Sequence, residues 1–273
     1  MFEFSTPIRV YEFNPAFLTI GQISLRWYSL AYIFGILFTY YFLIKVNKKQ
    51  KFISDNALEN FIPYIIFSVI IGGRLGYILF YNFSYYLQYP LEILAFWHGG
   101  MSFHGGLAGV IIGMIFYCKK YQIPFFRLSD YLAICAPFGI FLGRIANFIN
   151  LELYGRVTES KFGMIFPNSD GLPRHPSQLY EATLEGLVLF IILINLYKFT
   201  NLKKYYGFSS GLFLLLYGIF RFLLENFREP DQQIGLIFDW LSMGQILCLP
   251  LILSGIVIIF YSLKKSQLKK IEN

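Results

Sequence analysis

The chain has 273 residues, of which 56% are hydrophobic, 20% are aromatic and only 14% are charged. Soluble domains carry about 25% charged residues, and here the apolar residues fall in blocks of roughly twenty, the length that crosses a hydrocarbon core. The composition therefore excludes an ordinary soluble domain and predicts an all-α, polytopic membrane protein. The net charge of +7 does not indicate a nucleic-acid partner, because the basic residues gather directly after apolar runs.

Seven apolar runs predict seven transmembrane helices. They cover residues 25–45, 58–82, 100–118, 128–150, 178–198, 207–227 and 241–263. Basic clusters follow the first, third, fifth and seventh runs and hold 14 of the 23 lysines and arginines. Because cytoplasmic loops are enriched in Lys and Arg, we predict an N-terminus outside and a cytoplasmic C-terminus. Residues 1–24 lack the basic start and small-residue cleavage site of a signal peptide, so we expect no cleavage.

Two segments are expected outside the membrane core. Residues 83–97 are rich in Tyr, Phe and Trp, are broken by Pro90 and are too short to span, so we expect them to lie in the interface. Residues 151–177 carry Gly, Pro and charges of both signs, which predicts a small periplasmic or extracellular cap. The sequence shows no internal repeat of the kind that would indicate an inverted-repeat transporter. We expect residues 1–273 to form a single integral membrane domain.

The three cysteines lie in or beside apolar runs and lack the CxxC spacing of a redox or zinc motif. They are Cys118, Cys135 and Cys248. This placement favours small apolar packing residues over a disulfide framework or a metal site.

Six of the predicted helices carry polar residues at a similar depth near their outer ends. These are Tyr28, Arg74, His104, Arg144, Asn147, Glu181, Arg221 and Glu225. At a rise of about 1.5 Å per residue they lie within roughly 5–12 Å of the outer hydrocarbon boundary, whereas the inner halves of the helices are almost purely apolar. A channel would carry polar groups through its full depth and a transporter near the midplane. The pattern therefore favours a site that opens to the outer leaflet.

The stretch 143–156, GRIANFINLELYGR, contains the most costly of these groups. A central arginine in a membrane helix costs about 2.5–3.5 kcal/mol and usually faces a bundle interior or a watery cavity. Arg144 and Asn147 are three residues apart and share a helix face. Arg144 and Arg221 together can fork onto phosphate oxygens, and His104, in the glycine-rich stretch GGMSFHGGLAG, can move a proton near neutral pH. These groups suit a phosphate ester at the depth of a lipid headgroup.

Several of these residues also have a structural interpretation. Arg74 and Arg144 can reach the interface by extending their side chains, and Tyr28 can belong to the aromatic belt. His104 can be a satisfied polar group where glycines let a neighbouring helix approach closely. Asp130 is interpreted as a helix-start residue.

The acidic residues can likewise be structural. Glu225 lies four residues after Arg221 and can neutralise it within the bundle, and Glu181 and Glu185 can be partners of the same kind. A lipid or solute transporter and a purely structural helix bundle are the alternative readings of the chain. The scarcity of polar residues in the inner halves disfavours the first, and the polar layer on six helices disfavours the second.

Six motifs carry a resemblance to a known family. They are RWYSLAY (26–32), GGRLGY (72–77), GGMSFHGGLAG (99–109), GRIANFINLELYGR (143–156), RHPSQLYEA (174–182) and YGIFRFLLENFREPD (217–231). Together they resemble the phosphatidylglycerol–prolipoprotein diacylglyceryl transferase family over nearly the whole chain, and the 143–156 stretch is similar to the family signature.

The resemblance implies a multi-pass enzyme of the bacterial inner membrane that begins lipoprotein maturation. Its partners would be phosphatidylglycerol and the lipobox cysteine of a prolipoprotein, joined as a thioether with release of glycerol phosphate. By resemblance, Arg144 and Arg221 hold the phosphate, and His104 is a candidate base whose role the sequence leaves open. The further implied site residues are Tyr28, Asn147, Glu152, Gly155, Tyr217 and Glu225. No metal, organic cofactor or nucleic acid is implied.

Overall fold

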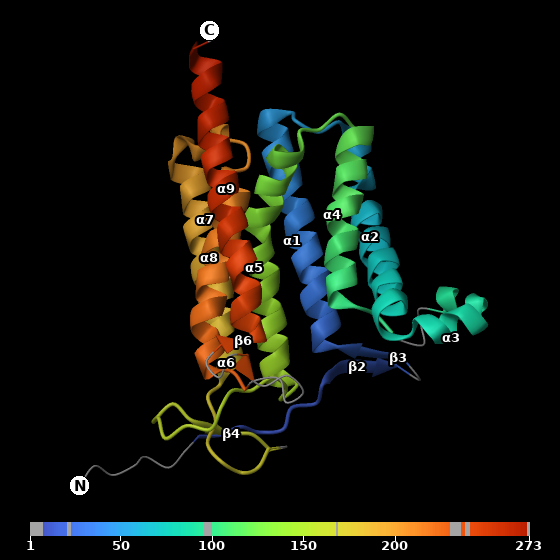
Figure 1. The fold of residues 1–273 in the computed structure, drawn as a ribbon, viewed down its shortest axis with the longest axis vertical. Coiled ribbons are helices and arrows are strands. Elements are labelled where there is room, and N and C mark those ends of the chain that lie inside the picture. Colours follow the sequence, from blue (N-terminus) through green and yellow to red (C-terminus); the bar gives the residue numbers. More distant parts are fainter. Residues whose placement is uncertain are drawn as a thin grey trace. The chain divides into compact units, whose positions relative to one another are not determined.

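The protein is described by a computed structural model in which helices dominate (Figure 1). The structure describes residues 8–20, 23–95, 100–167, 169–229, 236–237 and 241–271. Six helices within these ranges are long and apolar enough to cross a membrane: Trp27–Gln50, Asp55–Tyr81, Phe125–Ile149, Ser177–Phe199, Phe208–Phe227 and Met243–Lys265. This confirms a mostly helical chain with several candidate membrane spans. The seventh span and the orientation of the termini stay predictions.

The chain divides into two compact units. One comprises Met1–Thr39 with Ser129–Asn273, and we call it the first unit. The other, the second unit, comprises Tyr40–Leu128. Helix α1 (Trp27–Gln50) begins in the first unit and ends in the second.

The second unit is built on two helices that pack with their backbones in close contact. These are α2 (Asp55–Tyr81) and α4 (Phe103–Lys120), which corresponds to the predicted helix at 100–118. A Cβ atom added at Gly76 would lie 2.6 Å from the Cα atom of Gly105, and Gly109 lies in the same way against Gly72. The sequence prediction that glycines in this stretch permit close helix approach is thus confirmed for Gly105 and Gly109.

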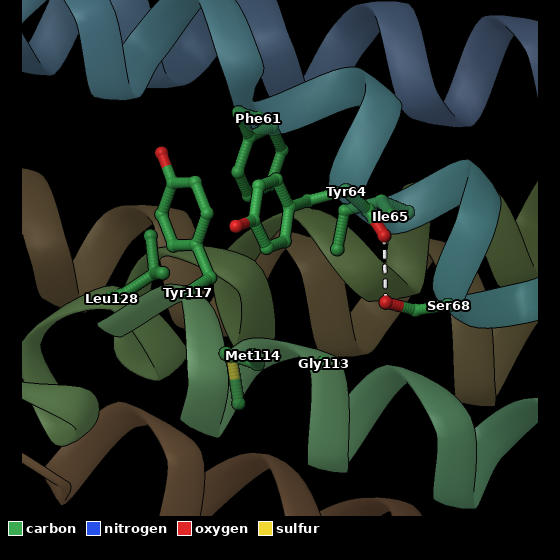
Figure 2. A pocket seen from close by; sticks show the side chains of 8 residues that line it. All are labelled: Phe61, Tyr64, Ile65, Ser68, Gly113, Met114, Tyr117 and Leu128. Carbon is green, nitrogen blue, oxygen red and sulfur yellow. Dashed lines mark hydrogen bonds between the residues drawn. The ribbon is translucent and has the colours of Figure 1, made fainter. Parts of the chain in front are cut away.

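A small cavity lies between α2 and α4 and is shown in Figure 2. Its volume is about 10 Å³, which is about the space of one water molecule. The hydroxyls beside it are already used, since Ser68 donates to the carbonyl of Tyr64 and Tyr117 to that of Ala57, both at 2.6 Å. The cavity is therefore a packing feature and not a substrate site.

The aromatic segment predicted to lie in the interface forms two short helices, α3 (Phe83–Gln88) and η1 (Pro90–Leu94). Arg74 of α2 binds the end of η1. Its Nε atom donates to the carbonyl of Ile93 at 3.0 Å, and its Nη2 atom donates to the carbonyl of Glu92 at 2.5 Å. The guanidinium also lies 5.1 Å from the ring centre of Tyr86. Arg74 is only 5% exposed, and its guanidinium binds the segment that is predicted to lie in the interface, so the interpretation that it extends to the interface stays a prediction. Residues 96 and 97 of the segment lie outside the described residues.

The helices of the first unit form a bundle in which α7, α8 and α9 run alongside one another (Figure 1). Its elements are α5 (Phe125–Ile149), α6 (Ser177–Glu181), the π-helical η3 (Ala182–Val188), α7 (Leu189–Phe199), the short η4 (Asn201–Lys204), α8 (Phe208–Leu224), η5 (Glu225–Phe227) and α9 (Met243–Ile271). The segments α6, η3 and α7 follow one another without a break. A Cβ atom at Gly186 of η3 would lie 2.7 Å from the Cα atom of Phe141, so α5 and η3 touch through their backbones.

Asp130 starts a helix, although not the one in which it lies. It is the sixth residue of α5, and its carboxylate accepts hydrogen bonds from the backbone N–H groups of Gly207 at 2.7 Å and Ser210 at 2.8 Å. It also accepts from the Ser210 hydroxyl at 2.8 Å. Since the first N–H groups of a helix have no partner within it, Asp130 caps α8 from a neighbouring helix.

Many side chains that do not pack against neighbouring helices are apolar, as expected for a surface that faces lipid. Leu253, Val257 and Phe260 of α9 are 63%, 65% and 68% exposed, and their spacing places them on one face. A stripe of large apolar side chains of this kind is favourable against lipid and costly against water. The three cysteines are free and buried, which confirms their predicted packing role.

Short strands occur outside the helices and were not predicted. β1 (Ile8–Arg9) pairs in parallel with β4 (Met164–Ile165), β2 (Ala16–Ile20) pairs antiparallel with β3 (Ile23–Arg26), and β5 (Leu236–Ile237) pairs antiparallel with β6 (Leu241–Ser242). The β1–β4 pair ties the N-terminal segment to residues 151–177, the segment that we call the cap.

Ion pairs of Arg174 hold the cap together. Its guanidinium lies 2.8 Å from Asp170 and 2.9 Å from Glu229, and it covers the ring of Tyr154 at 5.3 Å. The hydrogen bond from Arg174 lowers the pKa of Asp170 below its ordinary value, since a charged donor favours the carboxylate form.

Candidate active site

Six charged side chains of the first unit meet where α5, α6, η3, α8 and η5 adjoin. They are Arg144, Glu181, Glu185, Arg221, Glu225 and Arg228, and we call them the arginine–glutamate cluster. Three positive and three negative charges balance one another. Buried ions need such pairing, because each unpaired one costs several kcal/mol.

Glu181 lies at the centre of the cluster. Its Oε2 atom is 2.8 Å from Nη1 of Arg144, and its Oε1 atom accepts a hydrogen bond from Nη1 of Arg228 at 2.7 Å. Oε1 also lies 3.3 Å from Nη1 of Arg221. With its side chain only 1% exposed, Glu181 joins the three arginines from the buried side.

Glu185 lies one helical turn further along and is held less tightly. Its Oε2 atom is 3.3 Å from Nη2 of Arg144, and its Oε1 atom is 3.7 Å from Nη1 of Arg221. The side chain is 0% exposed. Arg144 and Arg221 therefore each face both carboxylates, although they come from different helices.

Glu225 pairs with Arg221 as its spacing predicts. The Oε2 atom of Glu225 is 3.0 Å from Nη2 of Arg221, and its Oε1 atom accepts a hydrogen bond from the Ser242 hydroxyl at 3.1 Å. Gly244, at the start of α9, leaves room for this carboxylate, since an added Cβ atom would lie 2.6 Å from Cδ of Glu225. The position of Arg221 thus depends on α9 as well as on its own helix.

The cluster presents its arginines toward its more accessible side. The side chains of Arg144, Arg221 and Arg228 are 18%, 17% and 15% exposed, whereas those of Glu181 and Glu185 are 1% and 0% exposed. An approaching anion would therefore meet guanidinium groups first. Nη1 of Arg221 is a buried atom that lies 3.3 Å from Glu181 and 3.7 Å from Glu185 and makes no hydrogen bond with any described residue.

A second polar group lies at the end of α5, where Asn147 meets Glu152. Nδ2 of Asn147 donates to Oε1 of Glu152 at 2.8 Å. Leu151 and Leu153 have φ angles of 58° and 60°, a left-handed conformation that is uncommon outside glycine. This turn is held by Gln178, whose Nε2 atom donates to the carbonyl of Glu152 at 2.7 Å. The strained turn fixes the backbone of Glu152 and thereby the position from which its side chain extends.

Gly155 lies where the cap crosses the chain after α8. Its N–H group donates to the carbonyl of His175 at 2.8 Å, and an added Cβ atom would clash with the carbonyl oxygen of Phe227. Gly155 also forms a β-bridge with Arg228, and Nε of Arg156 donates to the Arg228 carbonyl at 2.7 Å. Glycine is therefore required for the close approach that positions Arg228. Burial lowers the pKa of the neighbouring His175.

The family model for prolipoprotein diacylglyceryl transferase matches residues 15–261. The chain belongs to the prolipoprotein diacylglyceryl transferase family. It is 54% identical over 251 residues to the phosphatidylglycerol–prolipoprotein diacylglyceryl transferase of Rickettsia felis, covering 91% of this chain and 96% of the relative. The protein of that name from Rickettsia bellii is 53% identical over 247 residues, covering 90% and 94%. The resemblance seen in the sequence is confirmed, and the chain is a transferase.

Several of the predicted site residues come together in the structure. Arg144, Arg221 and Glu225 meet in the arginine–glutamate cluster, and Asn147 and Glu152 contact each other at the end of α5. Both groups lie in the first unit.

The remaining predicted site residues have other surroundings. Tyr217 lies one turn before Arg221 on α8, with its ring stacked on Phe213 at 5.7 Å. Tyr28 is the second residue of α1, and its ring lies edge-on against Tyr32 at 5.1 Å. His104 is the second residue of α4, in the second unit, and its side chain lies outside the described part of the structure.

Sequence reasoning did not assign three residues that the structure places at the site. Glu181 and Glu185 were interpreted only as structural partners, and Arg228 was given no role. Their spacing in the sequence could have indicated this grouping, since Glu181 and Glu185 are four residues apart and Arg228 follows Glu225 by three, which places each pair on one helix face. No group of three or more His, Cys, Asp or Glu within the described residues is placed to hold a metal ion.

Proposed function

We propose that the chain transfers the diacylglyceryl group of phosphatidylglycerol to the thiol of the lipobox cysteine of prolipoproteins, which forms a thioether and releases glycerol phosphate. This is the first step of bacterial lipoprotein maturation. The names of the relatives from Rickettsia felis and Rickettsia bellii state both substrates. Membership of the family over residues 15–261 supports the same activity for this chain.

The observation that carries the proposal is the arrangement of Arg144 and Arg221. The two guanidiniums come from different helices, share Glu181 and Glu185 on their buried side and are the more exposed members of the cluster. Paired guanidiniums bind phosphate oxygens through forked, charge-assisted hydrogen bonds. We assign both residues to the phosphate of the lipid.

The chemistry is a displacement at the glyceryl carbon that is bonded to the phosphate oxygen. The substrate thiolate attacks this carbon, the carbon–oxygen bond breaks, and its electron pair stays on the phosphate. Arg144 and Arg221 stabilise the charge that develops there, as fixed donors do in other active sites. Because the nucleophile belongs to the substrate, the buried cysteines of the chain need not take part.

The thiol must lose its proton, since a free thiol has a pKa of about 8.5 and the thiolate is the nucleophile. We assign this step to His104 as the candidate base, because histidine transfers protons near neutral pH. The proton leaves with the base, and glycerol phosphate departs as the anion.

The other family positions are assigned to substrate binding. Glu225 orients Arg221, Gly155 allows the close approach beside Arg228, and Asn147 and Glu152 offer amide and carboxylate groups. Tyr28 and Tyr217 complete this set.

We further propose that residues 1–273 form one transferase domain in the bacterial inner membrane. It has seven transmembrane helices, of which α4 is the third, an outside N-terminus and a cytoplasmic C-terminus. The distribution of Lys and Arg after alternate apolar runs supports this topology. The cap would then lie in the periplasm, beside the leaflet from which lipid and lipobox reach the site.

Replacing either arginine tests the proposal. Arg144→Ala and Arg221→Ala should abolish diacylglyceryl transfer in isolated membranes while the protein still inserts, because the phosphate loses a ligand. Transfer is followed by the mass of a lipobox peptide and insertion by immunoblotting of the membrane fraction. Normal transfer by both variants would refute the assignment of these arginines.

A further inference from the structure

Glu185 is a fully buried carboxylate that depends on the two arginines assigned to the lipid phosphate. Its contacts with Arg144 and Arg221 are 3.3 Å and 3.7 Å long, and its side chain is 0% exposed. No described residue donates a hydrogen bond to its Oε1 atom. Any ligand that draws the two guanidiniums away leaves Glu185 as a buried ion without a partner.

The charge balance of the cluster makes this consequence severe. Three arginines and three glutamates cancel before the substrate arrives. A phosphodiester adds one negative charge and takes over hydrogen-bond donors that the glutamates used. Because burial disfavours the charged form of a carboxylic acid, the added charge is most easily compensated by a proton on one glutamate.

We propose that Glu185 takes up a proton when the lipid phosphate binds and releases it when the phosphate leaves. The inference rests on the proposed function, because it requires Arg144 and Arg221 to be phosphate ligands. The proton comes from water, and no bond of the lipid is made or broken in this step. Glu185 is then a positioning residue that holds the arginines in the empty site and, once neutral, leaves them to the substrate.

The other groups around Glu185 are less suited to take the proton. Glu181 keeps its 2.7 Å contact with Arg228, and Glu225 keeps the hydrogen bond from Ser242. The remaining neighbours are already neutral or permanently charged near pH 7. The titratable and charged groups that interact with Glu185 are Arg144 on α5, Glu181 on α6, Tyr217 and Arg221 on α8, and Cys248 on α9.

This coupling makes lipid affinity depend on pH in one direction. A proton bound together with the ligand is harder to obtain as the pH rises, so the affinity falls by up to about tenfold per pH unit. Glu185→Gln supplies a neutral side chain of the same shape. Its affinity should therefore lose the component of pH dependence due to Glu185 and should exceed that of the unmodified chain at high pH.

The test is isothermal titration calorimetry of the detergent-solubilised full chain with a short-chain phosphatidylglycerol. Titrations at pH 7 in PIPES and in Tris, whose ionisation heats differ, count the protons taken from the buffer. We expect about one proton per lipid for the unmodified chain and for Glu59→Gln, an exposed glutamate of α2 that serves as the control. Glu185→Gln should take up close to none.

The outcomes separate the inference from the function on which it rests. Lipid binding without proton uptake by the unmodified chain overturns the inference and leaves the proposed function standing, whether or not the variant folds. Uptake of a full proton by Glu185→Gln overturns the assignment to Glu185. Absence of any lipid binding by the unmodified chain overturns the proposed function and the inference together.

Discussion

At the scale of single residues, the proposed phosphate site depends on guanidinium geometry. Arg144 and Arg221 each use more than one nitrogen, with Nη1 and Nη2 of each directed at carboxylate oxygens between 2.8 and 3.7 Å away. A planar fork of donors can exchange carboxylate partners for phosphate oxygens, whereas a lysine offers a single point charge. The identity of these residues should therefore matter as much as their charge.

Arg144→Lys and Arg221→Lys should lower kcat/KM of diacylglyceryl transfer by about 100- to 1,000-fold, the range seen when a charge-stabilising donor is removed. The measurement is the initial rate of thioether formation on a lipobox peptide, with Arg9→Lys on the exposed β1 strand as the matched control. Equal rates for all three variants would refute the forked geometry.

Gly244 offers a test of how Arg221 is held. Gly244→Ala places a methyl group against the carboxylate of Glu225 and should displace this partner of Arg221, lowering the transfer rate at least tenfold if the ion pair orients the guanidinium. Gly143→Ala is the control, since its added methyl group meets nothing within 4 Å. If the two variants have the same rate, the Glu225 contact does not position Arg221.

His104→Gln tests the assignment of the base. Removing the imidazole should lower the rate and remove from the pH–rate profile a limb with a midpoint near the ordinary histidine pKa of about 6.5. The rate is measured between pH 5.5 and 8.5 with the same peptide. An unchanged rate and profile would exclude His104 as the base.

At the scale of elements, α8 carries Arg221 and depends on Asp130 of α5 for its start. Asp130→Ala removes the acceptor of two backbone N–H groups and should cost about 1–2 kcal/mol, as other helix caps do. We expect a melting temperature in detergent that is lower by about 2–4 °C per kcal/mol, with transfer retained at low temperature. Asp130→Asn, which keeps one acceptor oxygen, should lie between. A melting temperature unchanged by Asp130→Ala would contradict the capping role.

The helices show which features the sequence could predict and which it could not. Blocks of apolar residues located the helices, because length and hydropathy are properties of single segments. The π-helical stretch Ala182–Val188 could not be predicted, because it depends on how η3 packs against α5 at Gly186. The partners of Arg74 could not be predicted for a related reason, since the carbonyl groups that it binds lie 18 and 19 residues away.

The candidate site was predicted in part for similar reasons. Arg144, Arg221 and Glu225 stand out as charges inside apolar runs, and the i, i+4 spacing anticipates the pair of Arg221 and Glu225. Spacing along one helix cannot show which helices adjoin, so the sharing of Glu181 and Glu185 by two arginines emerges only from the fold.

At the scale of the whole molecule, the number of spans determines whether the two ends of the chain lie on the same side of the membrane or on opposite sides. Seven spans place the termini on opposite sides, and six place them on the same side. Tyr11→Cys, Lys161→Cys and Lys265→Cys add exposed thiols to a chain whose own described cysteines are buried. A membrane-impermeant thiol reagent added to spheroplasts should label the first two variants, and the third only after permeabilisation. Labelling of both Tyr11→Cys and Lys265→Cys in intact spheroplasts would contradict seven spans.

The most direct test of the account as a whole is covalent transfer by the purified full chain. Phosphatidylglycerol labelled with an isotope in its diacylglyceryl part is incubated with a lipobox peptide, and the peptide is analysed by mass spectrometry. We predict a labelled diacylglyceryl thioether on the cysteine with the unmodified chain, and none with Arg144→Ala or with a serine in place of the peptide cysteine. A peptide of unchanged mass, with lipid that moves across the bilayer intact, would contradict the account.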